Sequence, residues 1–242
     1  MDLTAWEVAG CLAIVLVGAL VQGAIGFGVN LVATPVIALI APSALPGAVV
    51  LMSLPLTITM AAREHHAIDR RGVTWIFLGR LPGTAVGVAI VAAVSDSVLA
   101  AVIGALILLA VFLSVIHPHL RVNRATAFAA GSISGVTGTA AAIDGPPLAL
   151  LYQHEHGPRL RSTLATCFVI GTVMSAGALA VAGEITREQL ILTLVLLPAL
   201  LAGWGLSTFV APHVNGRLLR VLVLAFAAVT GAAALVRGLA TL

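Results

Sequence analysis

Residues 143–157 read IDGPPLALLYQHEHG and decide the organisation of the chain, because they place helix breakers inside an apolar region. An aspartate, a glycine and two prolines, residues 144–147, follow an apolar segment that ends near residue 142. Proline is favoured at the first position of a helix, and aspartate is favoured directly before it. The stretch therefore predicts a separate short helix that starts at Pro146 and covers residues 146–153.

The composition around this stretch is that of a protein embedded in a lipid bilayer. Of the 242 residues, 60% are hydrophobic and 9% are charged, whereas soluble domains carry about 25% charged residues. A spanning helix needs about 20 apolar residues, so the chain has room for roughly eight to ten membrane segments and no extramembrane domain. We expect an all-α polytopic integral membrane protein.

Two of the apolar segments are too short to cross a membrane. The segments lie near residues 6–28, 35–41, 44–62, 73–94, 98–116, 124–142, 146–153, 162–182, 189–210 and 217–237. At 1.5 Å per residue, segments 35–41 and 146–153 cover roughly 10 to 12 Å. That is less than half of a hydrocarbon core of about 30 Å. We interpret both segments as half-helices.

The order of long and short segments occurs twice, which indicates an internal repeat. Gln22-Gly23-Ala24-Ile25-Gly26 aligns with Ser134-Gly135-Val136-Thr137-Gly138, and the same offset places Pro35 on Pro147. Weak identity with a shared arrangement is typical of transporter repeats. We predict two transmembrane repeats, residues 1–120 and 121–242. Each consists of a re-entrant helix hairpin that contains a half-helix, followed by three transmembrane helices.

The arginines orient this arrangement in the membrane. With re-entrant hairpins, one side receives Arg63, Arg70, Arg71, Arg121, Arg124, Arg159, Arg161, Arg217 and Arg220. The positive-inside rule then makes that side cytoplasmic. The chain is expected in the cell inner membrane, with both termini on the outer side, and the two repeats are inverted. If each hairpin instead crosses as one segment, the last four of these arginines move outside. The hairpin arrangement is preferred because it separates the charges better.

Both predicted hairpins carry glycines ahead of their half-helix, which suggests a binding site. Gly26 and Gly28 precede Thr34-Pro35, and Gly138 precedes Asp144-Gly145. We expect helix starts at Pro35 and Pro146, each presenting unpaired N–H groups and roughly half a positive charge. Two such ends near the midplane suit an anion. The alternative is that the glycines, Gly23 and Gly135 above all, serve close helix packing.

Candidate substrate-binding residues follow from this arrangement. They are Gly26, Phe27, Gly28, Asn30, Thr34, Arg80, Gly138, Thr139 and Gly145. Arg80 lies about 10 Å into the membrane, where its guanidinium either binds an oxyanion or snorkels to the surface. Asp144 either caps its half-helix or carries a proton, because a carboxylate near the midplane is costly and would be repelled by a bound anion.

These stretches resemble a known family. GAIGFGVNLVATPV, residues 23–36, and GVTGTAAAIDGPPLALLY, residues 135–152, are similar to the Gly/Pro-rich motifs of the TauE/SafE family. The resemblance covers essentially the whole chain. It implies secondary transport, coupled to protons, of sulfur oxyanions such as sulfite, sulfoacetate and other organosulfonates. A glycine often precedes the Gly-Pro-Pro of this family, where the present chain has Asp144.

The sequence also bears on other classes of function. The pairs His65-His66 and His154-x-His156 invite a transition-metal or cation permease, although a structural zinc site needs four ligands at workable spacing. An intramembrane enzyme would need a motif such as HExxH or GxSxG, and neither occurs. The arginines form no continuous basic face for nucleic acid. We expect no metal and no cofactor; the partners are an anion, protons and the bilayer, and homo-oligomerisation is left open.

Overall fold

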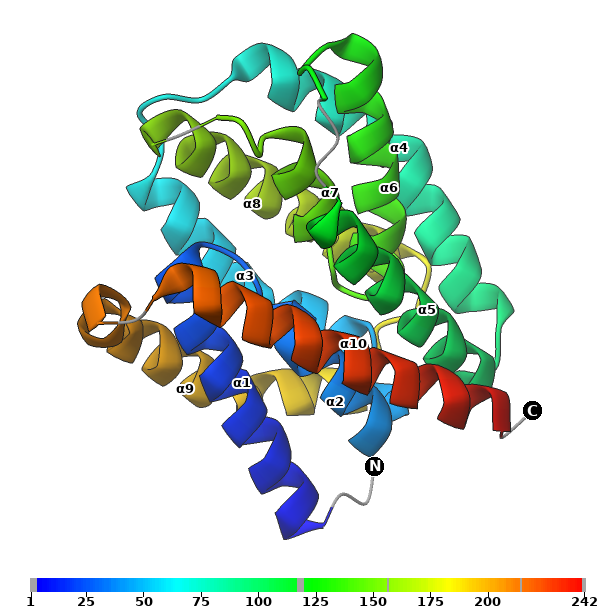
Figure 1. The fold of residues 1–242 in the computed structure, drawn as a ribbon. Coiled ribbons are helices and arrows are strands. Elements are labelled where there is room, and N and C mark those ends of the chain that lie inside the picture. Colours follow the sequence, from blue (N-terminus) through cyan, green and yellow to red (C-terminus); the bar gives the residue numbers. More distant parts are fainter. Residues whose placement is uncertain (1–3, 117–119, 156, 214, 241–242) are drawn as a thin grey trace.

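The computed structural model describes residues 4–116, 120–155, 157–213 and 215–240, and these residues fold into helices without any strand (Figure 1). Ten α-helices are described: α1 Ala5–Ile25, α2 Val29–Ile40, α3 Gly47–Arg63, α4 Arg70–Ala93, α5 Asp96–Val115, α6 Arg124–Ala140, α7 Gly145–Leu151, α8 Gly157–Val181, α9 Arg187–Val210 and α10 Gly216–Ala240. Short 3-10 turns at Pro42–Ala44 and Ala211–His213 precede α3 and α10. The all-helical class expected from the sequence is confirmed.

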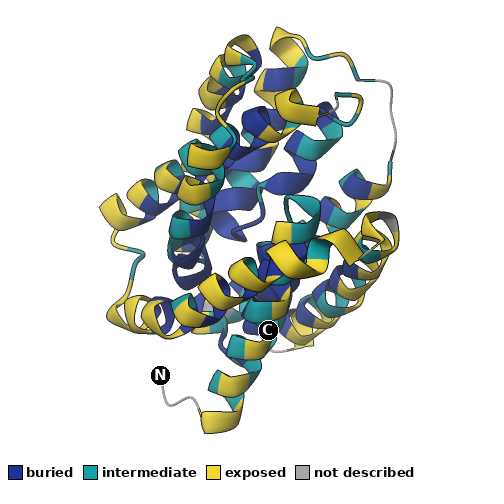
Figure 2. Ribbon diagram, turned by 90° about the vertical axis from the view of Figure 1, so that its left-hand side faces the viewer, coloured by how far each residue is buried: buried dark blue, intermediate teal, exposed yellow. Residues whose placement is uncertain are grey.

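Six helices are long and apolar enough to cross a membrane, namely α1, α4, α5, α8, α9 and α10, while α2 and α3 are shorter and apolar. Figure 2 shows that buried residues gather in the interior and exposed ones on the outward faces. Those outward faces carry large apolar side chains, for example Leu194, Phe209 and Val229. Since such surfaces are compatible with lipid and not with water, the chain is a multi-pass membrane protein.

The chain reverses direction at two interrupted helices. Between α1 and α2 it turns at Gly26 and Gly28, and α2 then runs back along α1, so that a β-carbon at Gly10 would lie 3.5 Å from Ile40. Between α6 and α7 the chain turns over residues 141–144. The end of α7 and the start of α6 then border the same cavity. Both segments are therefore helical hairpins whose break lies inside the molecule.

The predicted start of the first half-helix was wrong. We expected it at Thr34-Pro35, but α2 begins at Val29, and Pro35 lies inside the helix. The reason is that Gly26 and Gly28 adopt φ values of 89° and 122°, which glycine tolerates far better than other residues, so the turn is completed earlier. The second prediction was close: α7 begins at Gly145, with prolines in its first turn.

The helices of the two halves pack in matching pairs. α4 packs against α6 as α1 packs against α9, and α3 contacts α9 as α8 contacts α4. Likewise, α2 packs on α10 as α7 packs on α5. The other large contacts between the two halves join α3 to α8 and α5 to α10. Each of the two hairpins thus packs its shorter helix on the last helix of the other half, α2 on α10 and α7 on α5.

Glycines bring several of these helices into backbone contact. A β-carbon at Gly79 or Gly83 of α4 would collide with a carbonyl of α6, and one at Gly131 of α6 would collide with a carbonyl of α4. Gly135 faces the α4 backbone, and Gly23 faces Ser207 of α9. The packing role expected for Gly23 and Gly135 is therefore correct. Such close approach stabilises membrane helices by dispersion contacts.

Candidate functional site

The two breaks meet at the centre of the molecule. The Asn30 side chain, in the first turn of α2, donates a hydrogen bond of 2.7 Å to the carbonyl of Ala142 in the other break. The Ser53 hydroxyl of α3 donates to the side-chain Oδ1 of Asn30 at 2.9 Å. Ala142 has a φ of 57°, a conformation that alanine seldom adopts. Asn30 therefore stabilises an unusual turn in the opposite hairpin, and this contact uses the NH2 group of its side-chain amide.

A buried ion pair lies beside this junction. Arg80 of α4 is 1% exposed, and its guanidinium lies 3.4 Å from Oδ2 of Asp144, whose side chain is 18% exposed. Arg80 also donates to Ser134 of α6 at 2.9 Å and to Ser175 of α8 at 3.4 Å. The snorkelling alternative for Arg80 is therefore wrong. Its side chain points into the protein and joins three helices to the second break.

The surroundings of Arg80 are shaped to accept the guanidinium. A β-carbon at Gly171 of α8 would collide with it, and one at Gly138 would lie 2.9 Å from Nη2. The Nε atom of Arg80 is buried without a hydrogen-bond partner in the part of the chain that the structure describes. Because buried polar groups are nearly always paired, this donor leaves Arg80 with unused binding capacity.

The capping alternative for Asp144 is not supported. Asp144 occupies the position before α7, but its side chain makes no capping hydrogen bond. Its carboxylate faces Arg80 instead. Its backbone carbonyl accepts a hydrogen bond of 2.9 Å from Ser134. Arg80 holds the Asp144 side chain, and the Ser134 hydroxyl holds the Asp144 main chain. The carboxylate can therefore change partners while the backbone stays in place.

The two helix starts differ in the donors they offer. In α2 the N–H of Val29 is bonded to the Gln22 side chain at 3.0 Å, and the next two N–H groups have no acceptor within the helix. In α7, Pro146 and Pro147 carry no N–H at all. The expected symmetry of two equal anion-attracting helix ends is therefore absent. Arg80 supplies the positive charge on the side of α7.

Small cavities at the junction share lining residues with a wider one. Two cavities of about 30 and 10 Å³ are bordered by both breaks, Asn30 and Asp144 being common to the two. Gln22 and Phe27 also line a cavity of about 410 Å³, which reaches Arg63, Arg161 and Arg220. The inner cavities hold only water-sized volumes, so a larger occupant requires Phe27 or the ion pair to move.

Most of the predicted binding residues gather here. Phe27, Gly28, Asn30, Asp144 and Gly145 line the larger of the two inner cavities. The others surround it: Gly138 lines the smaller cavity, Gly26 lines the wide one, and Thr139 bonds to Ser175 at 2.9 Å. Thr34, Thr139 and Arg80 are not among the residues that line these cavities. Thr34 is buried inside α2, and Arg80 reaches the inner cavities only through its contacts with Asp144 and Ser175, which line them.

Two serines of the site were not predicted. Ser134 and Ser175 contact Arg80, and neither was named as a candidate. The repeat alignment contained a signal for Ser134, because it places this residue on Gln22. Gln22 and Ser134 both bond to the main chain of their own break. No pattern in the sequence identifies Ser175, which reaches the site only through the packing of α8.

Among the described residues, no group of three or more histidine, cysteine or acidic side chains is placed to hold a metal ion. His65 bonds to the carbonyl of Ala62 at 2.7 Å, and His154 lines a different cavity near the starts of α4 and α6. His156 lies outside the described residues.

Comparison with known proteins agrees with this architecture. The family described as "Sulfite exporter TauE/SafE" matches residues 11–234, nearly the whole chain. Neither the curated proteins nor the solved structures give a significant match. Members of the matching family are transporters and not enzymes. The chain therefore belongs to the TauE/SafE family, whose members export sulfite and related sulfur compounds across membranes.

Proposed function

We propose that the protein is a proton-coupled secondary transporter that exports small sulfur oxyanions, such as sulfite, sulfoacetate or other organosulfonates. The substrate binds at the junction of the two breaks, between the start of α2 and Arg80. Asp144 carries the coupled proton. The observation that supports this proposal most directly is the buried ion pair between Arg80 and Asp144, 3.4 Å long, at the edge of the central cavities.

The ion pair supports coupling because an anion and the Asp144 carboxylate compete for one guanidinium. With Asp144 ionised, the charge of Arg80 is neutralised and the pair is stable. A sulfonate or sulfite oxygen that replaces the carboxylate leaves two anions side by side, which is unfavourable at low dielectric. Proton uptake by Asp144 removes that repulsion. Anion binding and proton binding then favour each other, which is what coupling requires.

The donors at the site match an oxyanion. The planar guanidinium of Arg80 can bind two oxygens at once, and its Nε donor has no partner among the described residues. The open N–H groups in the first turn of α2 add the positive end of a twelve-residue helix. Sulfite and sulfonates present three oxygens around one sulfur, so donors on two sides of the cavity can be satisfied together.

The route to the site also favours anions. The wide cavity carries Arg63, Arg161 and Arg220 against Glu64, a net charge of +2. Charged, low-dielectric walls raise the local concentration of ions of opposite sign. We infer from the positive-inside rule that this side is cytoplasmic and that both termini lie on the opposite, outer side of the inner membrane. The wide cavity then opens on the side from which an exporter collects its substrate.

We infer that residues 1–120 and 121–242 are inverted repeats, and that transport alternates between equivalent arrangements of the two hairpins. The reciprocal packing of the two halves supports this inference. If the two hairpins exchanged their arrangements, the wide cavity would close at Phe27, and a cavity would open on the opposite side of the membrane. In such transporters, rigid parts rock around a fixed central site.

Flux measurements in liposomes test the proposal. The purified protein is reconstituted, and the flux of sulfite, sulfoacetate and taurine is measured with and without a proton gradient. The flux of a divalent metal is measured separately, as the alternative substrate. Because the anion and the proton bind together, we expect anion flux that is accelerated by a proton gradient directed the same way as the flux. Arg80→Leu should abolish it, whereas Arg187→Leu, which removes an exposed arginine at the start of α9, should not. Metal flux without any anion response would refute the assignment.

A further inference from the structure

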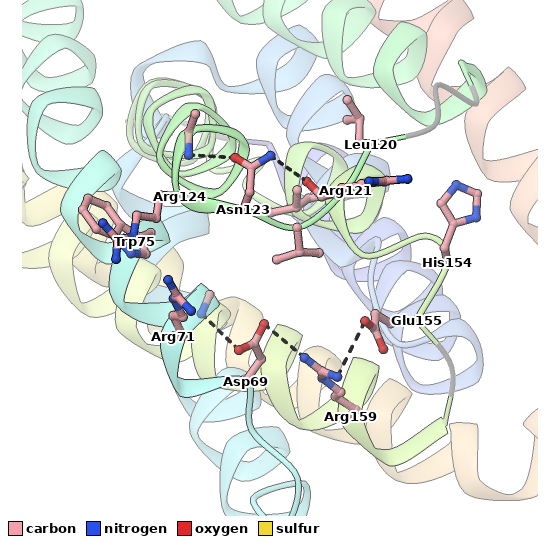
Figure 3. Close-up of a pocket in the computed structure, with 14 residues that line it drawn as sticks. Asp69, Arg71, Trp75, Leu120, Arg121, Asn123, Arg124, His154, Glu155 and Arg159 are labelled. Carbon is pink, nitrogen blue, oxygen red and sulfur yellow. Dashed lines mark hydrogen bonds and ion pairs between the residues drawn. The ribbon is translucent and has the colours of Figure 1, made fainter.

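A second cavity, of about 800 Å³, lies at the starts of α4, α6 and α8 (Figure 3). It shares no lining residue with the central cavities or with the wide cavity that leads to them. Its volume is in the range of ligand-binding pockets, roughly 300 to 1,000 Å³. The transport mechanism proposed above makes no use of it.

The charge of this cavity is unbalanced. Arg71, Arg121, Arg124 and Arg159 line it, together with the acids Asp69 and Glu155. Both acids pair with Arg159, Asp69 at 3.6 Å and Glu155 at 3.8 Å, and dashed lines mark the two pairs in Figure 3. Within the described residues, no carboxylate pairs with any of the other three arginines. The cavity therefore has a net charge of +2: the three guanidinium groups without an anionic partner among the described residues contribute +3, and Arg159 with its two acids contributes −1.

Two of these arginines stand where a helix disfavours them. Arg71 is in the first turn of α4, and Arg124 is the first residue of α6. Helix starts carry partial positive charge, so a cation there lowers helix stability unless an anion is close by. Arg124 is also held over the ring of Trp75, 5.6 Å from its centre. This contact orients the guanidinium beside the cavity.

An apolar surface continues from the cavity along the same two helices. Phe128 lies one turn after Arg124 and is 40% exposed, and Leu78 lies one turn after Trp75 and is 37% exposed. Residues three or four apart share a helix face. In a membrane this face contacts acyl chains, while the arginines lie at the level of the headgroups. A ligand with an anionic head and an apolar tail matches both parts.

We propose that this cavity binds the phosphate group of an anionic phospholipid at the arginine-rich surface of the membrane. The planar guanidiniums of Arg71 and Arg124 recognise phosphate oxygens through paired hydrogen bonds, and Arg121 adds charge. The acyl chains lie along Phe128 and Leu78. Basic pockets between membrane helices bind such headgroups. The lipid then clamps the starts of α4 and α6, the helices that carry Arg80 and Ser134.

Lipid titration of the purified protein tests this proposal. The full chain, in an uncharged detergent, is titrated with phosphatidylglycerol or phosphatidylcholine, and bound lipid is counted by native mass spectrometry. We expect saturable binding of phosphatidylglycerol only. Each arginine contributes about fivefold, so Arg71→Gln combined with Arg124→Gln should weaken binding by about 30-fold. If the double variant does not fold, Arg121→Gln alone should weaken binding by about fivefold.

Controls separate the lipid from other sources of phosphate. Arg70→Gln removes the neighbouring exposed arginine, which does not line the cavity, and should leave the affinity unchanged. Inorganic phosphate and glycerol phosphate should not displace the lipid at equal concentration, because they lack the apolar contact. Displacement by either would assign the cavity to a soluble phosphate and overturn the proposal. Equal loss in Arg70→Gln, or equal binding of both lipids, would overturn it too.

Discussion

Replacing Asp144 with asparagine separates the charge of the central carboxylate from its shape. Asparagine keeps the size and one oxygen of Asp144, and its amide represents the protonated acid. At a separation of 3.4 Å and an effective dielectric constant of about 20, the lost attraction to Arg80 is about 5 kcal/mol. Removing one partner of a buried pair destabilises proteins by about 3 to 5 kcal/mol. We expect a folded variant with a lower melting temperature.

The same change should strengthen anion binding. In the variant, the anion no longer competes with a carboxylate for Arg80. A hydrogen bond to a charged group is worth about 1.5 to 3 kcal/mol, which corresponds to roughly tenfold to 150-fold higher affinity. The anion should also raise the melting temperature of Asp144→Asn more than that of the wild type, because it restores the missing negative charge beside Arg80.

The sign of the pH dependence provides the sharper readout. If each bound anion brings one proton, the dissociation constant of the wild type rises about tenfold per pH unit wherever free Asp144 is ionised. Asp144→Asn has no proton to take up at this position, so its dissociation constant should not change with pH. Calorimetric titration with sulfoacetate, which keeps its charge near neutral pH, measures both slopes.

Two controls keep this test specific. Glu184→Gln changes a carboxylate to an amide in the loop between α8 and α9, away from the central cavities, and should retain the wild-type slope. Combining Arg80→Gln with Asp144→Asn should restore part of the lost stability, because no buried charge remains unpaired. A steep pH slope in Asp144→Asn would refute the role of Asp144 in coupling. Loss of anion binding in that variant would refute the competition for Arg80.

Three further outcomes are expected. Arg80→Lys keeps the charge but loses the planar fork, so anion affinity should fall at least tenfold in calorimetric titration, and unchanged affinity would contradict bidentate recognition. Gly83→Leu forces a side chain into the carbonyl of Ser132 and should prevent stable folding in detergent, as judged by size-exclusion chromatography; Gly205→Ala, where nothing lies within 4 Å, should be neutral. Asn30→Ala releases the opposite break and should cost about 1 to 3 kcal/mol in thermal unfolding, and an unchanged melting temperature would show that this hydrogen bond is dispensable.

The sequence was sufficient to predict the interrupted helices but not where the first one resumes. Gly26 and Gly28 marked the first break correctly, and Asp144 with the prolines after it marked the second. Pro35 was misleading, because a proline inside a membrane helix is tolerated when neighbouring helices compensate for the missing hydrogen bond. Local preferences therefore located the turns, and the positive φ values of Gly26 and Gly28 set the start of α2 at Val29, ahead of Pro35.

The residue types of the central site were also accessible from the sequence, but their partners were not. Arg80 and Asp144 are 64 positions apart, and Ser175 comes from a third helix. No periodicity connects such positions. Both alternatives considered for Arg80 and Asp144 treated each residue alone, so the possibility that they neutralise each other was missed.

By itself, the sequence determined that this chain is a multi-pass, all-helical membrane protein with two broken helices, because hydropathy and the placement of glycine and proline act locally. Only the tertiary structure decided that the breaks meet, through Asn30 and Ala142, and that Arg80 pairs with Asp144. Proline carries no N–H, so the sequence alone also determines that α7 starts poor in donors; only the tertiary structure decided that the buried Arg80 supplies positive charge there. A lone ion inside the membrane is costly, so its partner must come from wherever the packed helices place one.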